Sequence, residues 1–141
     1  MTKNKILIVE DDEDLLEIET LMLSTRGYEV SGVLDGTAAL GTVERIKPDL
    51  ILLDIMLPGM DGYEVCRQLK ANDATSHIPV IMLTAKKSKE DFVMGEQAGA
   101  DMYITKPYKT SIVIETIQRL LSWISASVDC PQASFLICHD F

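Results

Sequence analysis

The chain has 141 residues, a formal net charge of −9 and a sequence pI near 4.6. That length fits one domain, which can bury about two-thirds of the surface of its unfolded chain. The acidic balance excludes a nucleic-acid-binding surface, since such surfaces need clustered Lys and Arg. The apolar runs are shorter than the roughly 20 residues of a membrane helix, and MTKNK is too soon followed by a strand pattern to be a signal peptide. We therefore expect a cytoplasmic protein that binds neither nucleic acid nor a membrane.

Five short apolar runs alternate with stretches of helical periodicity. The runs are residues 5–9, 28–33, 50–53, 79–83 and 101–105. The helical stretches, in chain order, end at Gly27, cover 38–47, run from 61 to about 71, run from 88 to 99, and end near 124. Leu15, Ile18 and Met22 define the first helix, and Asp35, Asp61 and Ser88 are N-cap candidates for later ones.

This alternation predicts a doubly wound five-stranded α/β fold, with parallel strands and helices on both faces of the sheet. The strands are apolar almost throughout, which is typical of sheets covered on both faces. On the last helix, Val113, Ile117, Leu120 and Ile124 lie at core-facing spacing. We expect one domain over residues 1–124, followed by a tail over 125–141 with no assigned structure and no effector domain.

Polar residues follow four of the apolar runs. They are Glu10, Asp11 and Asp12 after the first run, Asp54 after the third, Thr84 (followed by the small Ala85) after the fourth, and Lys106 after the fifth. In a doubly wound sheet these positions meet at one edge, where ligands bind. Carboxylate oxygens suit Mg²⁺, which takes one or two carboxylates plus a phosphate oxygen. The pattern predicts a Mg²⁺ site, although Asp12 by itself is better explained as a helix cap.

Four motifs give the chain a specific resemblance to the receiver domains of two-component response regulators. They are ILIVEDD, LILLDIMLPGMDGYE, PVIMLTA and GADMYITKP, in that order and at the family's intervals from Lys5 to about Leu121. The resemblance implies strand order 2-1-3-4-5, a cis bond between Lys106 and Pro107, and membership of a phosphorelay. It also implies a sensor histidine kinase or histidine phosphotransfer protein as partner, and Mg²⁺ as cofactor.

The resemblance also assigns roles to individual residues. Asp54 would be the phospho-acceptor, Lys106 would pair with the phosphoryl group, and Thr84 with Tyr103 would form the switch pair. Glu10, Asp11, Asp54 and the backbone carbonyl of Met56 would hold Mg²⁺, and Ala85 would contact the phosphoryl group. These roles agree with elementary chemistry, because a carboxylate can attack phosphorus while a metal ion and a lysine offset the developing charge. Such a chain is no enzyme on other substrates and catalyses only its own phosphorylation and dephosphorylation.

The chain also departs from the pattern of many DNA-binding members of that family. Met102 stands where they carry an acid, and Ile112 and Thr116 stand where they carry Glu and Arg, so their charged dimer interface is not expected. By the same resemblance, Met56 and Lys86, two residues past Asp54 and Thr84, would flank the path of a hydrolytic water and tune the lifetime of the phosphate.

Three alternative functions stay open at this point. The chain could be the receiver part of a longer DNA-binding transcriptional regulator. It could be a phosphatase with an aspartate nucleophile, although Met56 stands where such an enzyme needs an acid-base aspartate. It could be a flavodoxin-like nucleotide carrier, although acids follow the first strand in place of a Gly-rich or Ser-rich phosphate loop.

An output surface is predicted near the last helix. Ile112 and Trp123 fall outside its core-facing stripe. With Phe92 and Tyr103 they are expected to form an apolar surface for a downstream protein or for self-association, which rotation of Tyr103 would alter. In the alternative interpretation, Trp123 packs against the apolar residues of the tail.

Overall fold

The computed structural model describes residues 3–126 and 136–138. The strands are β1 Lys5–Val9, β2 Glu29–Val33, β3 Leu50–Leu53, β4 Val80–Thr84, β5 Met102–Thr105 and β6 Leu136–Cys138. The helices are α1 Glu13–Ser24, α2 Gly36–Ile46, α3 Gly62–Ala71, α4 Lys89–Ala98 and α5 Thr110–Ala126. All strand pairs are parallel, in the order β2-β1-β3-β4-β5-β6. The predicted doubly wound fold and the order of its five strands are therefore confirmed.

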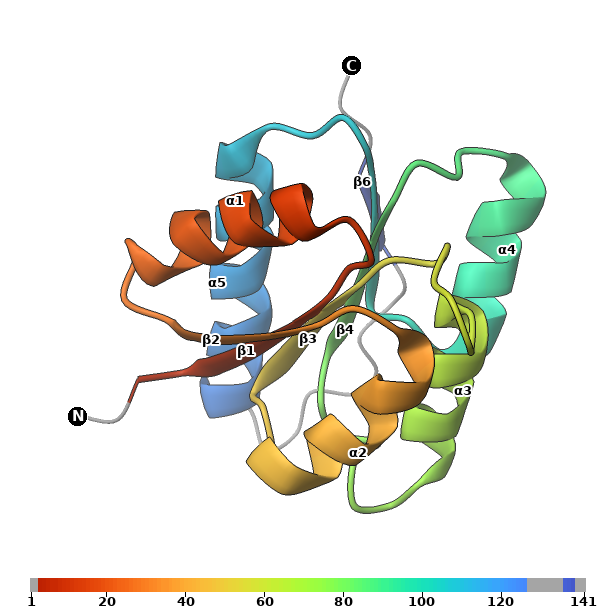
Figure 1. The fold of residues 1–141 in the computed structure, drawn as a ribbon, viewed down its shortest axis with the longest axis horizontal. Coiled ribbons are helices and arrows are strands. Elements are labelled where there is room, and N and C mark those ends of the chain that lie inside the picture. Colours follow the sequence, from red (N-terminus) through yellow and green to blue (C-terminus); the bar gives the residue numbers. More distant parts are fainter. Residues whose placement is uncertain (1–2, 127–135, 139–141) are drawn as a thin grey trace.

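Two apolar cores fill the space between the sheet and its helices. One face of the sheet packs against α2, α3 and α4, and the other packs against α1 and α5 (Figure 1). Successive residues of each strand point to opposite faces, so Met102 and Ile104 of β5 lie in the second core while Tyr103 lies in the first. Val113, Ile117 and Leu120 of α5 are buried as predicted, and the side chain of Ile124 lies outside the described residues.

Side-chain caps fix where several helices begin. The Asp35 carboxylate accepts a hydrogen bond from the Ala38 amide at 2.7 Å. Ser88 and Asp91 form a reciprocal capping box, in which each side chain accepts from the other residue's amide. Gly99, which ends α4, has a φ of +94°, a conformation that favours glycine. The ends of these helices are thus set by residues that lie close to them in the sequence, as predicted.

Two features differ from the sequence-based expectation. Helix α5 continues to Ala126, and β6 adds a sixth strand beside β5, both within the segment expected to be a tail. A strand of three residues is too short for its periodicity to be recognised. On α1 the helix forms as predicted, but Ile18 is 62 % exposed whereas the neighbouring Glu19 is 1 % exposed. No described helix has the length and apolar character needed to cross a membrane.

Candidate functional site

Strand register brings the polar strand ends together. Val9 of β1 pairs with Leu53 of β3, so the residues that follow them, Glu10 and Asp54, are neighbours at the same edge of the sheet. Thr84 of β4 pairs with Thr105 of β5, the residue before Lys106. The parallel topology therefore gathers onto one edge side chains that lie far apart in the sequence.

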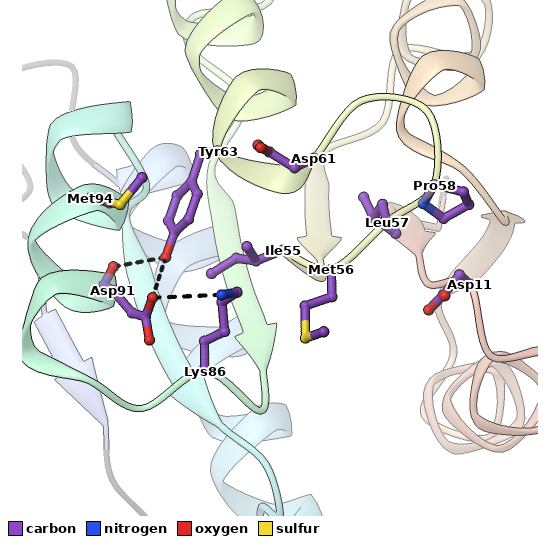
Figure 2. Close-up of a pocket in the computed structure, with 10 residues that line it drawn as sticks. All are labelled: Asp11, Ile55, Met56, Leu57, Pro58, Asp61, Tyr63, Lys86, Asp91 and Met94. Atoms are coloured by element: carbon purple, nitrogen blue, oxygen red, sulfur yellow. Dashed lines mark hydrogen bonds and ion pairs between the residues drawn. The ribbon is translucent and has the colours of Figure 1, made fainter.

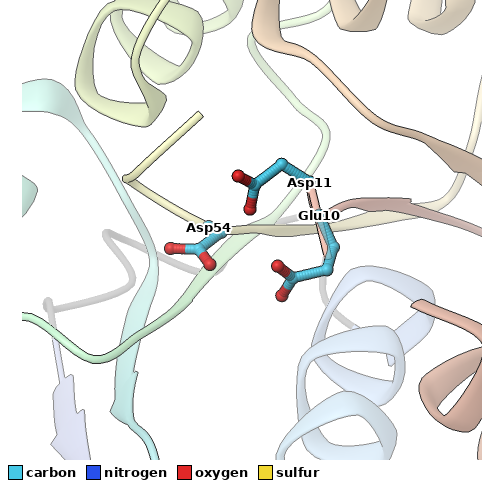
Figure 3. Close-up of side chains that lie close together, drawn as sticks. All are labelled: Glu10, Asp11 and Asp54. Carbon is cyan, nitrogen blue, oxygen red and sulfur yellow. The ribbon is translucent and has the colours of Figure 1, made fainter. Parts of the chain in front are cut away.

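Three carboxylates converge at this edge. One oxygen from each of Glu10, Asp11 and Asp54 lies within 4.8 Å of the others (Figure 3). Glu10 and Asp54 are 3 % and 8 % exposed, whereas Asp11 is open to solvent. Carboxylate oxygens that are partly buried and partly accessible are the donor set of a hard divalent cation that keeps some of its waters. The three acids predicted to bind a metal are thus brought together, and they fit Mg²⁺.

Lys106 lies against two of these acids. Its Nζ donates to Glu10 Oε1 at 2.6 Å and to Asp54 Oδ2 at 3.0 Å. Burial lowers the pKa of Lys106, but the hydrogen bonds to both carboxylates outweigh it and raise the pKa above its ordinary value. Burial raises the pKa of Glu10, and the Lys106 ammonium only partly offsets that effect. The Lys106 side chain therefore bridges the Glu10 and Asp54 side chains, and these contacts favour its cationic form.

The loop after β3 holds Asp54 in place. The Met56 amide donates to Asp54 Oδ1 at 3.2 Å, so both carboxylate oxygens of Asp54 have a donor. A Cβ atom on Gly62 would lie 2.3 Å from the Asp54 carbonyl oxygen, so only glycine lets α3 begin this close to the loop. The Met56 side chain is 59 % exposed beside the site. The coordination of a metal by its carbonyl stays a prediction.

Thr84 and Tyr103 both contact the same residue of the loop between β4 and α4. Thr84 Oγ1 accepts from the Lys86 amide at 3.4 Å, and the Tyr103 hydroxyl donates to the Lys86 carbonyl at 2.9 Å. Both side chains are fully buried, while Ala85, the residue that follows Thr84, is exposed. The loop that follows Thr84 is thus physically connected to the Tyr103 ring.

A pocket of about 620 Å³ opens beside the acids, between the loop after β3 and α4 (Figure 2). Asp11 lies at one end, and Tyr63, Asp91 and Met94 lie at the other. The Tyr63 hydroxyl donates to the Asp91 carbonyl at 3.2 Å, and Lys86 Nζ lies 3.9 Å from Asp91 Oδ1. These contacts fix the wall that faces Met56.

Of the residues predicted to form an output surface, Phe92 and Tyr103 lie together, whereas Ile112 belongs to the other core. Tyr103 contributes no exposed area, and Phe92 packs edge-to-face against its ring with centroids 4.8 Å apart. Ile112 packs against the core on the opposite face of the sheet. The side chain of Trp123 lies outside the described residues. The group therefore consists of an aromatic pair, with Tyr103 buried and Phe92 partly buried, and an aliphatic residue that packs against the other core.

One buried polar contact was not predicted from the sequence. The Tyr108 hydroxyl donates to Glu19 Oε2 at 2.8 Å, joining α1 to the segment just after Lys106. Burial raises the pKa of Glu19 to about 7, and the Tyr108 hydrogen bond only partly opposes this. The sequence did not predict this burial, because Ile18 was expected to face the core. The neighbouring acid, Glu19, was then expected to lie on the solvated face of the helix.

Comparisons with known proteins agree with this geometry. The family described as response regulator receiver domain matches residues 6–118. The chain is 44 % identical over 119 residues to the DNA-binding response regulator MtrA of Mycobacterium tuberculosis, covering 84 % of this chain and 51 % of the relative. It is 47 % identical over 116 residues to the sensory transduction protein RegX3 of the same species, covering 82 % and 50 %. The chain thus spans about half the length of the curated relatives it matches.

Solved structures show the same arrangement. The signal receiver domain of a histidine kinase from Syntrophus aciditrophicus superposes with a TM-score of 0.83 at 37 % identity, covering 92 % of this chain and 98 % of that one. A putative response regulator from Chloroflexus aurantiacus gives a TM-score of 0.82 at 32 % identity, covering 86 % and 99 %. From its motifs, its fold and these likenesses, the chain belongs to the receiver domain family of two-component response regulators.

Proposed function

We propose that this receiver accepts a phosphoryl group on Asp54 from a sensor histidine kinase or a histidine phosphotransfer protein. The observation that carries the proposal is the position of Asp54, which contacts the Lys106 ammonium and lies within 4.8 Å of Glu10 and Asp11 oxygens. A nucleophile for phosphorus needs such surroundings, because its own charge repels an anionic donor. We expect the reaction to take place in the cytoplasm.

In the transfer step, a carboxylate oxygen of Asp54 bonds to phosphorus while the bond from phosphorus to the donor's imidazole nitrogen breaks. The imidazole leaves with the electron pair of that bond and takes up a proton. The Lys106 ammonium lies beside Asp54 and would contact a phosphoryl oxygen, and the Thr84 hydroxyl would donate to another. The backbone at Ala85 follows Thr84 toward the same edge and is a further candidate contact.

Glu10, Asp11 and Asp54, with the carbonyl of Met56, would hold Mg²⁺. Three carboxylates gather beside the Lys106 ammonium, so a divalent cation suits the local charge. When bound, the ion would neutralise charge on the phosphoryl oxygens. Glu10 would then exchange part of its contact with Lys106 for contact with the ion.

We propose that the output is a conformational change near Lys86. If Thr84 turns toward a phosphoryl oxygen, its contact with the Lys86 amide is lost, and the loop that also holds the Tyr103 hydroxyl is free to move. The changed surface would bind a downstream protein or a second copy of the chain. Met56 and Lys86 flank the approach to Asp54 and would set how quickly water removes the phosphate, the only other reaction proposed for this chain.

A second candidate concerns the whole protein. MtrA is described as a DNA-binding response regulator, and this chain covers only about half of it. If the chain is part of a longer regulator, a separate segment would bind DNA, and the receiver would control that segment. The net charge of −9 argues that the receiver itself does not bind DNA.

Incubation with acetyl phosphate and Mg²⁺ tests the proposed acceptor. Intact mass should rise by one phosphoryl group, and chelation of the metal should prevent the increase. Asp54→Asn should abolish it, whereas Asp73→Asn, which changes an exposed acid in the turn after α3, should not. An unchanged wild-type mass, or a labelled Asp54→Asn variant, would refute the assignment.

A further inference from the structure

The second apolar core contains an acid that the proposed chemistry does not use. Glu19 of α1 is 1 % exposed, next to core residues such as Leu23. On the same helix Ile18 and Leu21 are 62 % and 65 % exposed. Burying a carboxylate while aliphatic side chains face water is costly, so a specific partner for Glu19 is expected.

That partner is Tyr108, whose hydroxyl donates to Glu19 Oε2 at 2.8 Å. The Tyr108 ring packs against the same core from the segment between β5 and α5. Tyr108 stands two residues after Lys106. The hydrogen bond therefore holds the backbone that carries the lysine.

The same two parts of the chain are joined a second time at the site itself. Lys106 contacts Glu10, which lies just before α1. Asp12 stands between Glu10 and α1 and caps that helix. The Glu10 contact is the one that would change when a metal ion and a phosphoryl group arrive. The Glu19 contact lies outside the acid cluster and would persist, leaving Lys106 attached to α1 through Tyr108.

We propose that Glu19 and Tyr108 are positioning residues, whose hydrogen bond keeps Lys106 within reach of the phosphoryl group during transfer to Asp54. Lysine has a long side chain with many rotamers, so a fixed backbone restricts where its ammonium can lie. This inference rests on the proposed function of Asp54 and Lys106. It assigns a use to a buried polar pair that packing alone does not require.

The first test is the rate of phosphorylation by acetyl phosphate, measured against donor concentration at saturating Mg²⁺. Tyr108→Phe removes only the hydroxyl and should lower the rate at saturating donor about tenfold, less than the roughly 10²-fold loss that a 1 Å misplacement can cause. Mg²⁺ affinity, measured by calorimetry, should stay within about twofold of wild type, since no proposed ligand changes. Glu19→Gln keeps an acceptor for the Tyr108 hydroxyl and should therefore retain most of the wild-type rate.

Tyr28→Phe is the matched control, because Tyr28 packs against the same core away from Lys106. It should be phosphorylated at the wild-type rate. The double variant Glu19→Leu with Tyr108→Phe replaces both polar groups by apolar ones, so it should fold and yet be as slow as Tyr108→Phe. A wild-type rate in a folded double variant would overturn the proposal and leave the pair a purely structural role.

A double-mutant cycle tests whether Tyr108 acts through Lys106. Once Lys106 is alanine, Tyr108→Phe should cause no further loss of rate, whereas independent effects would multiply and contradict the proposal. Absence of phosphorylation in the wild type would instead refute the proposed function itself, so the two failures are distinguishable.

Discussion

The Tyr103 hydroxyl donates a hydrogen bond to the Lys86 carbonyl at 2.9 Å, joining a fully buried ring on β5 to the loop that follows Thr84. Tyr103 could therefore report the state of the phosphate site without itself being on the surface. Any movement of the Lys86 carbonyl must therefore either break this hydrogen bond or move the Tyr103 ring with it.

Removing the Tyr103 hydroxyl should change the conformation of the loop without changing the phosphorylation of Asp54. Tyr103→Phe should lower the free energy of unfolding by about 1 kcal/mol, the usual net contribution of one hydrogen bond. Phosphorylation of Asp54 should continue at the wild-type rate, while the amide NMR signals of residues 85–88 should shift. A large fall in the phosphorylation rate would show that the ring also supports the chemistry.

Lys106→Ala should have opposite effects on the reaction and on the metal. The phosphorylation rate should fall, because the cation beside Asp54 is gone. Mg²⁺ affinity should rise, by about tenfold for each 1.4 kcal/mol of cation–cation repulsion removed. Lys89→Ala, an exposed lysine at the start of α4, is the control and should change neither quantity. Weaker Mg²⁺ binding in Lys106→Ala would argue that the lysine organises the acids.

Glu19 should make stability depend on pH. Burial raises its pKa from the ordinary value of 4.5 to about 7, with Glu10 and Asp54 adding to the shift and Tyr108 and Lys106 opposing it. Below the ordinary pKa, Glu19 is protonated in both the folded and the unfolded chain, so its burial does not require a buried charge. As pH rises, the unfolded chain loses this proton first, so folded stability falls until both states are ionised above the raised value.

The comparison that isolates this effect is wild type against Glu19→Gln, unfolded by urea with metal chelated. Relative to the variant, the wild type should lose about 3 kcal/mol of its free energy of unfolding between about pH 4 and about pH 8. This follows from about 1.4 kcal/mol for each unit by which the Glu19 pKa is raised. Parallel stability curves would mean that Glu19 titrates normally.

Two glycines in helices should respond oppositely to alanine. Gly62→Ala places a Cβ atom 2.3 Å from the Asp54 carbonyl oxygen and should destabilise the fold by about 2 kcal/mol or more. Gly41 lies in α2 with no atom within 4 Å of its Cβ position, so Gly41→Ala should stabilise by about 0.5–1 kcal/mol. Thermal unfolding of both variants tests this, and a neutral Gly62→Ala would mean that the Asp54 loop adjusts freely.

Much of this structure follows from short-range patterns. The apolar runs, the caps at Asp35 and Ser88, and the stop at Gly99 depend on neighbouring residues, so the sequence predicts the elements. The site follows almost as directly, because a parallel sheet gathers strand ends at one edge, which places Asp54 and Lys106 together.

Two features that the sequence did not predict have a common cause. The burial of Glu19 depends on Tyr108, which lies 89 residues away, and the separation of Ile112 from Tyr103 depends on which face of the sheet each occupies. Helical periodicity describes one element and carries no information about its partner. Strand β6 is missed for another reason, since three residues are too few to show a period.

Chemical trapping of the phosphorylated residue tests the central claim most directly. Borohydride reduces an acyl phosphate of aspartate to homoserine, which peptide mass spectrometry can locate. After incubation with acetyl phosphate and Mg²⁺, homoserine should be found at position 54, in wild type but not in Asp54→Asn. Homoserine at Asp11 or Asp12, or none in a protein shown to be folded, would contradict Asp54 as the phospho-acceptor.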